Sequence, residues 1–310
     1  MPYYPLLRTK QNEMLAVREA SEAIASSRKV FPVFEPVRTG QTLVRSFQLI
    51  AQNRVEFGLI INPSVGDYTN AANLLEQELF GPLRSESVSY VPFLMIGANT
   101  ASTSVSRILN RYPTSSIGVV ITAAPADPGI LQVINGEARI QHAIILERRV
   151  SRSFAQLIHR SKSITFNDRF NRAERNADYP DDEFFCDRSN PTNGGIVNRY
   201  GDFSIVGENF SESGGPAYAV ALHHIYRHKS GDLHIRHYVS DQTETPDDPA
   251  AKYIEALSKC VADLRQLGQL NNTPTCEIYR DLLRKRHFPG LGAAKKHALR
   301  HHFELICAST

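Results

Sequence analysis

The stretch Phe57-Gly-Leu-Ile-Ile-Asn-Pro63 is a short apolar run whose first polar side chain is Asn62, at its end. A strand that is apolar on both faces is typical of a parallel sheet, because helices cover one face and the interior of the sheet covers the other. The run therefore predicts a buried parallel strand.

Runs of similar length and character recur at regular spacing over the first two thirds of the chain. Together with the first they are Tyr3–Arg8, Val30–Val37, Phe57–Pro63, Tyr90–Gly97, Ile117–Thr122, Ile140–Glu147, Ser163–Asp168 and Asp202–Gly207. The segments between them carry apolar residues every three or four positions, as amphipathic helices do. Eight strands alternating with helices predict an α/β fold, a (β/α)8 TIM-like barrel. An open doubly wound sheet is the main alternative.

The pattern changes after the eighth run. Ala217–Arg227 and Leu233–Ser240 flank the turn Lys229-Ser-Gly-Asp232, which predicts an antiparallel hairpin, and a helix is expected over Pro249–Leu267. We therefore expect residues 1–215 to form the barrel. Residues 216–310 are expected to form a C-terminal β-hairpin and helices packed on it, so that the whole is one structural domain.

Composition and missing motifs exclude several classes of protein. Of the 310 residues, 42% are hydrophobic and 22% are charged, which is typical of a globular chain. No apolar run approaches the roughly 20 residues of a membrane span, and the four cysteines lack zinc-site spacing, so a cytoplasmic protein with free thiols and no membrane partner is expected. Glycine-rich nucleotide fingerprints and a Gly-x-Ser-x-Gly elbow are also missing, which argues against NAD, P-loop and serine-hydrolase chemistry.

Polar residues at the ends of the expected strands are the candidates for chemistry, because active sites of such barrels lie at the C-terminal ends of the strands. The candidate catalytic residues are Lys10, Glu35, Glu147 and Asp168, and the candidate substrate-binding residues are Arg8, Asn62, Arg169, Asn171 and His223. Glu35 and Glu147 each end an apolar run, which suits a general acid and base whose carboxylates need partners when buried. The alternative is that these carboxylates only form salt bridges with neighbouring arginines and lysines.

The segment from Asn167 to Asp202 is long and lacks helical periodicity, which is typical of a functional loop. Its density of acidic and amide side chains suits a hard divalent cation or a phosphorylated substrate. No cofactor is indicated beyond such a metal, for which the candidate ligands are Asp168, Asp178 and Asp202. Alternatively, the run Asp181-Asp-Glu183 is only a solvated surface.

Histidines gather on the expected hairpin. His223 and His224 end its first strand, whereas His234 and His237 lie on its second, so that alternation brings His223 close to one of the latter. Paired histidines bind metals or move protons. A hydrogen-bonded structural role is the alternative reading.

The basic segment Arg284–His302 contains a Pro-Gly-Leu-Gly turn and resembles a helix-hairpin-helix element, whose backbone N–H groups bind a nucleic-acid phosphate. The candidate DNA- or RNA-binding residues are Arg284, Lys285, Lys295 and Lys296. Lys296 and Lys285 stand where such elements carry apolar residues. A solvated pair of basic helices is therefore the alternative, and the net charge of +3 does not by itself imply nucleic-acid binding.

Several short motifs together suggest a family. They are Tyr4-Pro-Leu-Leu-Arg-Thr-Lys-Gln-Asn-Glu-Met-Leu-Ala16, Phe31-Pro-Val-Phe-Glu-Pro36, Arg175-Asn-Ala-Asp-Tyr179, Asp182-Glu-Phe-Phe185, Tyr200-Gly-Asp-Phe203 and Phe288-Pro-Gly-Leu-Gly292. The chain resembles the "beta protein" family of bacteria and their phages, a largely uncharacterised family. The resemblance implies a bacterial or mobile-element setting and transfers no catalytic mechanism.

These observations favour an enzyme, a metal-assisted hydrolase or a lyase that acts on a phosphorylated or nucleotide-type substrate in antiviral defence. In this hypothesis Arg8, Lys10 and Arg169 bind anionic groups, and Glu35 and Glu147 transfer protons. The rival hypothesis is a non-catalytic barrel that serves as a scaffold and binds a partner protein or a nucleic acid through the hairpin and the basic tail. Fold alone does not choose between the two.

Overall fold

A computed structural model describes residues 2–190, 199–211, 215 and 217–309 of the chain. Its contacts divide the chain into two compact units. The first comprises Met1–Lys10, Phe31–Asn167 and Val197–Phe203, and the second comprises Gln11–Val30, Asp168–Ile196 and Ser204–Thr310. The boundary expected after residue 215 lies inside the last segment of the second unit.

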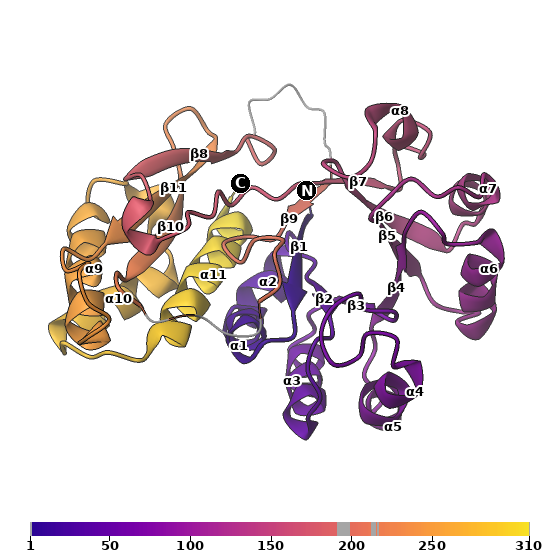
Figure 1. Cartoon of the computed structure of the whole chain (residues 1–310), viewed down its shortest axis with the longest axis horizontal. Helices are drawn as coiled ribbons and strands as arrows, with labels where there is room; N and C mark the ends of the chain where they lie inside the picture. Colours follow the sequence, from indigo (N-terminus) through magenta and orange to yellow (C-terminus); the bar gives the residue numbers. More distant parts are fainter. Residues whose placement is uncertain (1, 191–198, 212–214, 216, 310) are drawn as a thin grey trace. The chain divides into compact units, whose positions relative to one another are not determined.

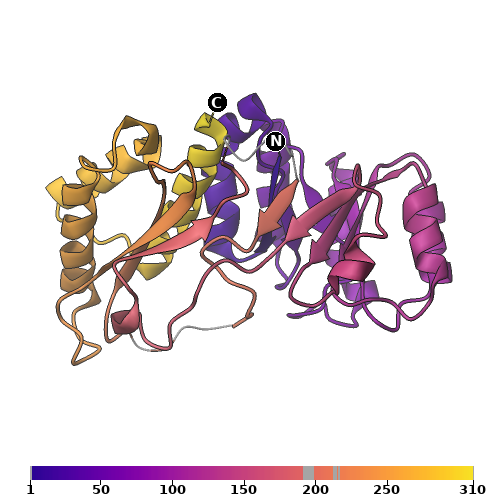
Figure 2. The ribbon, with the colours of Figure 1, turned by 90° about the horizontal axis from the view of Figure 1, so that it is seen from above.

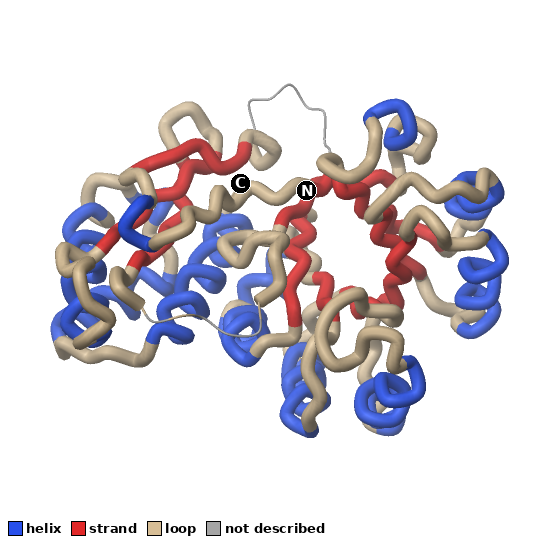
Figure 3. The backbone as a smooth tube through the Cα atoms, viewed as in Figure 1, coloured by secondary structure: helices blue, strands red, loops and turns tan. Residues whose placement is uncertain are grey.

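The first unit is a closed barrel of parallel strands in the order β1-β2-β3-β4-β5-β6-β7-β9, with β9 paired back to β1. Figures 1 and 3 show the strands as a ring. Their bounds are β1 Tyr3–Arg8, β2 Val33–Glu35, β3 Gly58–Ile60, β4 Val91–Ile96, β5 Ile117–Ile121, β6 Ile140–Leu146, β7 Ser163–Phe166 and β9 Tyr200–Asp202. The predicted (β/α)8 TIM-like barrel is confirmed.

The eighth barrel strand begins and ends earlier than predicted. We expected it over Asp202–Gly207, whereas β9 covers Tyr200–Asp202 and pairs with β1 through Tyr3 and Pro5. Ser204 has a left-handed backbone with φ of 50°, which a continuing strand does not allow. Phe203 and Ile205, which follow Asp202, are buried, but not as part of this strand.

The helices of the first unit lie outside the ring (Figure 3). They are α3 Gln41–Gln52, α4 Ala72–Leu75, the π-helical turn η1 Glu76–Phe80, α5 Gly81–Ser85, α6 Ser102–Arg111, α7 Gly129–Gly136 and α8 Arg152–Ala155. Side chains that point outward from the strands, such as Val119 and Ile145, pack with Val105 of α6 and Ile130 of α7. The inward side chains form a separate core inside the barrel.

Phe93 of β4 points into the barrel, and the strands on both sides of it carry a glycine at the level of its ring. A Cβ atom built on Gly58 of β3 would lie 2.4 Å from a ring carbon of Phe93, and one built on Gly118 of β5 would lie 2.3 Å from it. The two glycines therefore make room for the phenyl ring.

We predict that Gly118→Ala destabilises the protein by about 1–3 kcal/mol, because the added methyl group overpacks the barrel against Phe93. Urea denaturation measures the change in the free energy of unfolding. Phe93→Leu shortens the opposing side chain and should recover part of the loss when combined with Gly118→Ala. Strictly additive losses in this double-mutant cycle would contradict the proposed contact.

The second unit contains an antiparallel sheet in the order β10-β11-β8, with β10 Ala221–Arg227, β11 Leu233–Val239 and β8 Asp182–Cys186. Its helices are α1 Gln11–Glu19, α2 Ser21–Ser27, α9 Pro249–Asp263, α10 Pro274–Arg284 and α11 Leu291–Ala308, with 3-10 turns η2 Asn176–Asp178 and η3 Gln269–Asn271. The predicted hairpin is present as β10 and β11. Apolar residues of α9 and α10 pack with Leu222 and Tyr238 on one face of the sheet (Figure 2).

β8 corrects the interpretation of residues 167–202 as an irregular loop. Asp182, Glu183 and the apolar pair after them form the third strand of this sheet, so the acidic run is not simply a solvated surface. We missed the strand because its first half is acidic and its partner β11 lies about fifty residues further along the chain.

Candidate functional site

At the C-terminal end of the barrel, Arg8 and Glu35 lie opposite each other in the register of β1 and β2. Arg8 Nε is 3.9 Å from Glu35 Oε2, and only 6% and 3% of the two side chains are exposed. The backbone N–H and the hydroxyl of Ser64 both donate to Glu35 Oε1, at 2.7 and 2.8 Å. Because its oxygens are engaged by an arginine and a serine, the Glu35 carboxylate has the contacts expected of a structural ion pair.

Four other polar residues lie at or just after strand ends of the barrel. Glu147 is exposed just after β6. The Asn62 side chain bonds to both the N–H and the carbonyl of Met95, at 2.8 and 3.0 Å. Asp202 is buried and accepts a hydrogen bond from the Tyr3 hydroxyl. Lys10 is partly buried.

We predict that Glu35→Ala destabilises the protein by about 3–5 kcal/mol, because it leaves a buried guanidinium facing an apolar side chain. The matched variant Glu56→Ala removes an exposed carboxylate from the loop before β3 and should change stability by no more than about 0.5 kcal/mol. Equilibrium denaturation of both variants makes the comparison. Equal effects of the two substitutions would show that the Arg8–Glu35 pair does not stabilise the barrel.

Two of the expected metal ligands have local partners in the second unit. Asp168 accepts the N–H groups of Phe170, at 3.3 Å, and of Glu208, at 2.8 Å. Asp178 is exposed and pairs with Arg175, whose hydrogen bond lowers the pKa of this carboxyl group. Arg169, expected to bind substrate, is partly buried.

Across the described ranges, the one group of three or more His, Cys, Asp or Glu side chains close enough to share a metal ion is His224, Cys276 and His301. The carboxylates of Asp168, Asp178 and Asp202 do not form such a group.

Two other candidate residues, Asn171 and His223, are linked in the second unit through Glu183 and His237, which were not among the candidate site residues. His223 and His237 are register partners on β10 and β11, and their Nδ1 atoms are 2.7 Å apart. His237 Nε2 is 3.1 Å from Glu183 Oε1, and the Asn171 amide donates to Glu183 Oε2 at 2.9 Å. The predicted pairing of His223 with a histidine of the second strand is confirmed.

The order of these contacts determines which ring nitrogen of each histidine carries the proton. A carboxylate only accepts, so the proton of His237 lies on Nε2 and its Nδ1 accepts from His223. His223 then carries its proton on Nδ1, and its Nε2 keeps a lone pair. Burial lowers the pKa of His223 to about 3 and also lowers the pKa of His237, against the raising effect of Glu183, so both rings are neutral at pH 7.

Aromatic rings enclose the histidine pair. Tyr179 stacks on His237 with ring centroids 4.6 Å apart and meets His223 edge-on at 4.7 Å. Phe170 meets His223 edge-on at 5.0 Å. These contacts fix the orientation of the two imidazole rings.

A pocket of about 530 Å³ lies beside the hydrogen-bonded chain of Asn171, Glu183, His237 and His223, which we call the relay. Its lining residues are Ala177, Tyr179, Asp181, Asp182, Arg236, His237, Tyr238, Val239, Ser240 and Lys259. His237 of the relay and Tyr179, which stacks on it, both line the pocket. Most of the lining is polar, which suits a polar ligand rather than an apolar one.

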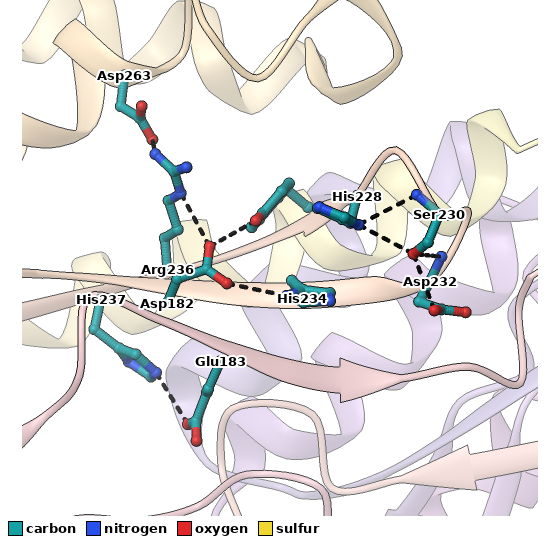
Figure 4. A network of polar contacts seen from close by, with 10 residues as sticks. Asp182, Glu183, His228, Ser230, Asp232, His234, Arg236, His237 and Asp263 are labelled. Carbon is teal, nitrogen blue, oxygen red and sulfur yellow. Dashed lines mark hydrogen bonds and ion pairs between the residues drawn. The ribbon is translucent and has the colours of Figure 1, made fainter.

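Asp182 organises a second polar network on the other side of the sheet from the relay (Figure 4). Its carboxylate accepts the Tyr226 hydroxyl at 2.6 Å and lies 3.0 Å from His234 Nδ1 and 3.1 Å from Arg236 Nε. Arg236 also pairs with Asp263. The Arg236 guanidinium is thus fixed at the pocket wall by two carboxylates.

The basic residues expected to bind DNA or RNA all lie near acidic side chains. Arg284 and Lys285 form exposed pairs with Asp281. Lys296 Nζ is 2.7 Å from Glu19, and Lys295 Nζ is 4.0 Å from Glu13, both on α1. These pairs tie α11 to α1 and reduce the positive charge available to a phosphate backbone, so nucleic-acid binding by this segment stays a prediction.

The buried histidines predict a stability that falls in acid. Burial lowers the pKa of His142 in the barrel and of His301 in the second unit to about 4, from a usual value near 6.5. The unfolded chain therefore binds more protons below pH 6.5, and each such histidine removes about 1.4 kcal/mol per pH unit as the pH falls from 6.5 toward 4.

We expect denaturation midpoints measured between pH 7 and 4 to show this loss of stability. His142→Phe should reduce the slope of the free energy of unfolding against pH by the contribution of one histidine. An unchanged slope in a folded His142→Phe protein would contradict the assignment.

Comparisons of the chain with protein-family models, with curated proteins and with solved structures returned no match. Within the described residues, no helix has both the length and the apolar character needed to cross a membrane.

Proposed function

We propose that this protein is an enzyme of the hydrolase or lyase class that performs acid–base chemistry on a phosphorylated or nucleotide-type substrate. The observation that carries the proposal is the hydrogen-bonded chain Asn171–Glu183–His237–His223 beside a polar pocket. The barrel of the first unit is a scaffold that many enzymes share, which agrees with the proposal without fixing the reaction.

In this proposal the substrate binds in the pocket beside His237, and the neighbouring His223 accepts a proton from it at Nε2. Its Nδ1 proton can pass to His237, and Glu183 stabilises the positive charge that develops on His237. Asn171 holds the carboxylate in place. The relay thus uses the same logic as other base–orienter pairs, in which a carboxylate fixes the tautomer and the orientation of an imidazole.

The pocket supports a substrate with anionic groups. Arg236 and Lys259 line it, and Arg236 keeps a fixed guanidinium orientation through its pairs with Asp182 and Asp263. Lys259 pairs with the more exposed Asp241 at 2.6 Å and is free to exchange that partner for a phosphate. Ser240 adds a hydroxyl to the same wall.

The wider setting belongs to the same proposal. The resemblance to the "beta protein" family suggests a bacterial cytoplasm and a role in defence against phages. The free cysteines of the described chain, Cys186, Cys260, Cys276 and Cys307, agree with a reducing compartment. The rival scaffold hypothesis needs a partner protein or nucleic acid, and salt-dependent retention on DNA or RNA tests it.

We predict that the purified chain converts at least one member of a panel of nucleoside phosphates, cyclic dinucleotides and p-nitrophenyl phosphate, with products resolved by chromatography. His223→Gln and Glu183→Gln should lower turnover by about 100-fold or more, because each interrupts proton transfer. His287→Gln is the matched control, because His287 is exposed just after α10 and lines neither the pocket nor the hydrogen-bonded chain, and it should change turnover by less than about threefold.

Two results would overturn the proposal. One is a relay variant that folds and keeps full turnover. The other is a parent protein that neither converts nor binds any member of the panel in calorimetry while it binds nucleic acid in a salt-dependent manner, which would favour the scaffold.

A further inference from the structure

His224, Cys276 and His301 form a second cluster that the proposed reaction does not use. They come from β10, α10 and α11, and all three are buried, with exposed fractions of 1%, 0% and 0%. One potential ligand atom from each lies within 4.8 Å of the others. Two imidazoles and a thiol at this spacing are the donor set of a zinc site.

The tautomer of His301 suits metal binding. Its Nε2 lies 2.8 Å from the carbonyl oxygen of Ile225, so Nε2 carries the proton and Nδ1 presents its lone pair to the cluster. A backbone carbonyl that accepts the second ring N–H is the usual partner of a metal-ligating histidine. The Thr273 hydroxyl, 2.7 Å from Nδ1, occupies the direction from which an ion would bind.

The distance between the nitrogen and the sulfur also fits. His301 Nδ1 and Cys276 Sγ are 3.9 Å apart. Zinc bonds of about 2.1 Å to nitrogen and about 2.3 Å to sulfur place these two atoms roughly 3.6 Å apart in a tetrahedral site. A shift of a few tenths of an ångström therefore lets both bind one ion.

His224 supplies the independent observation. Neither of its ring nitrogens has a hydrogen-bond partner among the described residues, although the side chain is buried. A buried polar atom without a partner costs about 1–3 kcal/mol, so such a group is rare unless something absent from the chain itself satisfies it. His224 stacks on His301 with ring centroids 3.9 Å apart, and no hydrogen bond prevents its ring from turning toward a shared ion.

The charges around the cluster are compatible with a cation. The Glu304 carboxylate is buried and accepts the N–H of Thr275, the residue before Cys276, at 2.9 Å. A bound cation would displace the proton of the Cys276 thiol to solvent and leave a thiolate bound to the ion.

We propose that His224, Cys276 and His301 bind one zinc ion, which links the edge strand of the sheet to the two C-terminal helices. The fourth position falls to the Thr273 hydroxyl or to a water molecule. Because the site is closed and lies apart from the relay residues, its role is to stabilise the second unit.

Cobalt(II) is the probe for this site, because a cobalt–thiolate bond gives a charge-transfer band in the near ultraviolet. The full chain, stripped with a chelator and kept reduced, should develop this band to saturation at one equivalent of Co²⁺, and Zn²⁺ should abolish it. Zn²⁺, but not Mg²⁺, should raise the melting temperature of the stripped protein.

Three variants make the test specific. Cys276→Ser should lose the band, whereas Cys186→Ser, which changes another buried cysteine of the same unit, should keep it. His224→Gln keeps the thiol and should weaken Co²⁺ binding by about tenfold or more, with circular dichroism as the check on folding. The proposal fails if the folded parent shows no band with excess Co²⁺, if folded Cys276→Ser keeps the band, or if His224→Gln binds Co²⁺ as the parent does.

Discussion

Pairing of β9 with β1 is the constraint on which the rest of the structure depends, because without it the first unit would be an open sheet with two unpaired edges. Three residues, Tyr200–Asp202, provide this closure. The chain must leave the barrel after β7 and return for β9, and residues 168–190 belong to the second unit. Residues 11–30, between β1 and β2, also belong to that unit, so the chain alternates between the two units before the barrel closes.

The barrel could be predicted from the sequence because burial on both faces leaves apolar runs that need no knowledge of their partners. Seven of the eight runs contain the barrel strands that we expected, and Phe57–Pro63 is representative. The last strand was misplaced because Phe203 and Ile205 are apolar for reasons other than strand pairing. Local hydropathy does not distinguish a barrel strand from another buried segment.

The candidate site was only partly predictable, because its contacts join residues far apart in the chain. Alternation on the hairpin indicated that His223 would meet a partner, but nothing local showed that Glu183 would lie across the sheet from it. The same limit applies to Glu35, whose place at a strand end suggested catalysis and whose contacts with Arg8 and Ser64 are those of a buried ion pair. Charge pairing depends on the register between strands and on loop geometry, and neither is visible in a single sequence.

His223 and His224 are neighbours in the chain, yet they lie in different clusters of side chains, because successive side chains of a strand point to opposite faces of the sheet. One meets His237, and the other stacks on His301. A slip of β10 by one residue would exchange these environments and destroy both at once. The length of the turn Lys229-Ser-Gly-Asp232, which sets the register of the hairpin, is therefore under a double constraint, and a single inserted residue there would be far more damaging than most substitutions on the strands it joins.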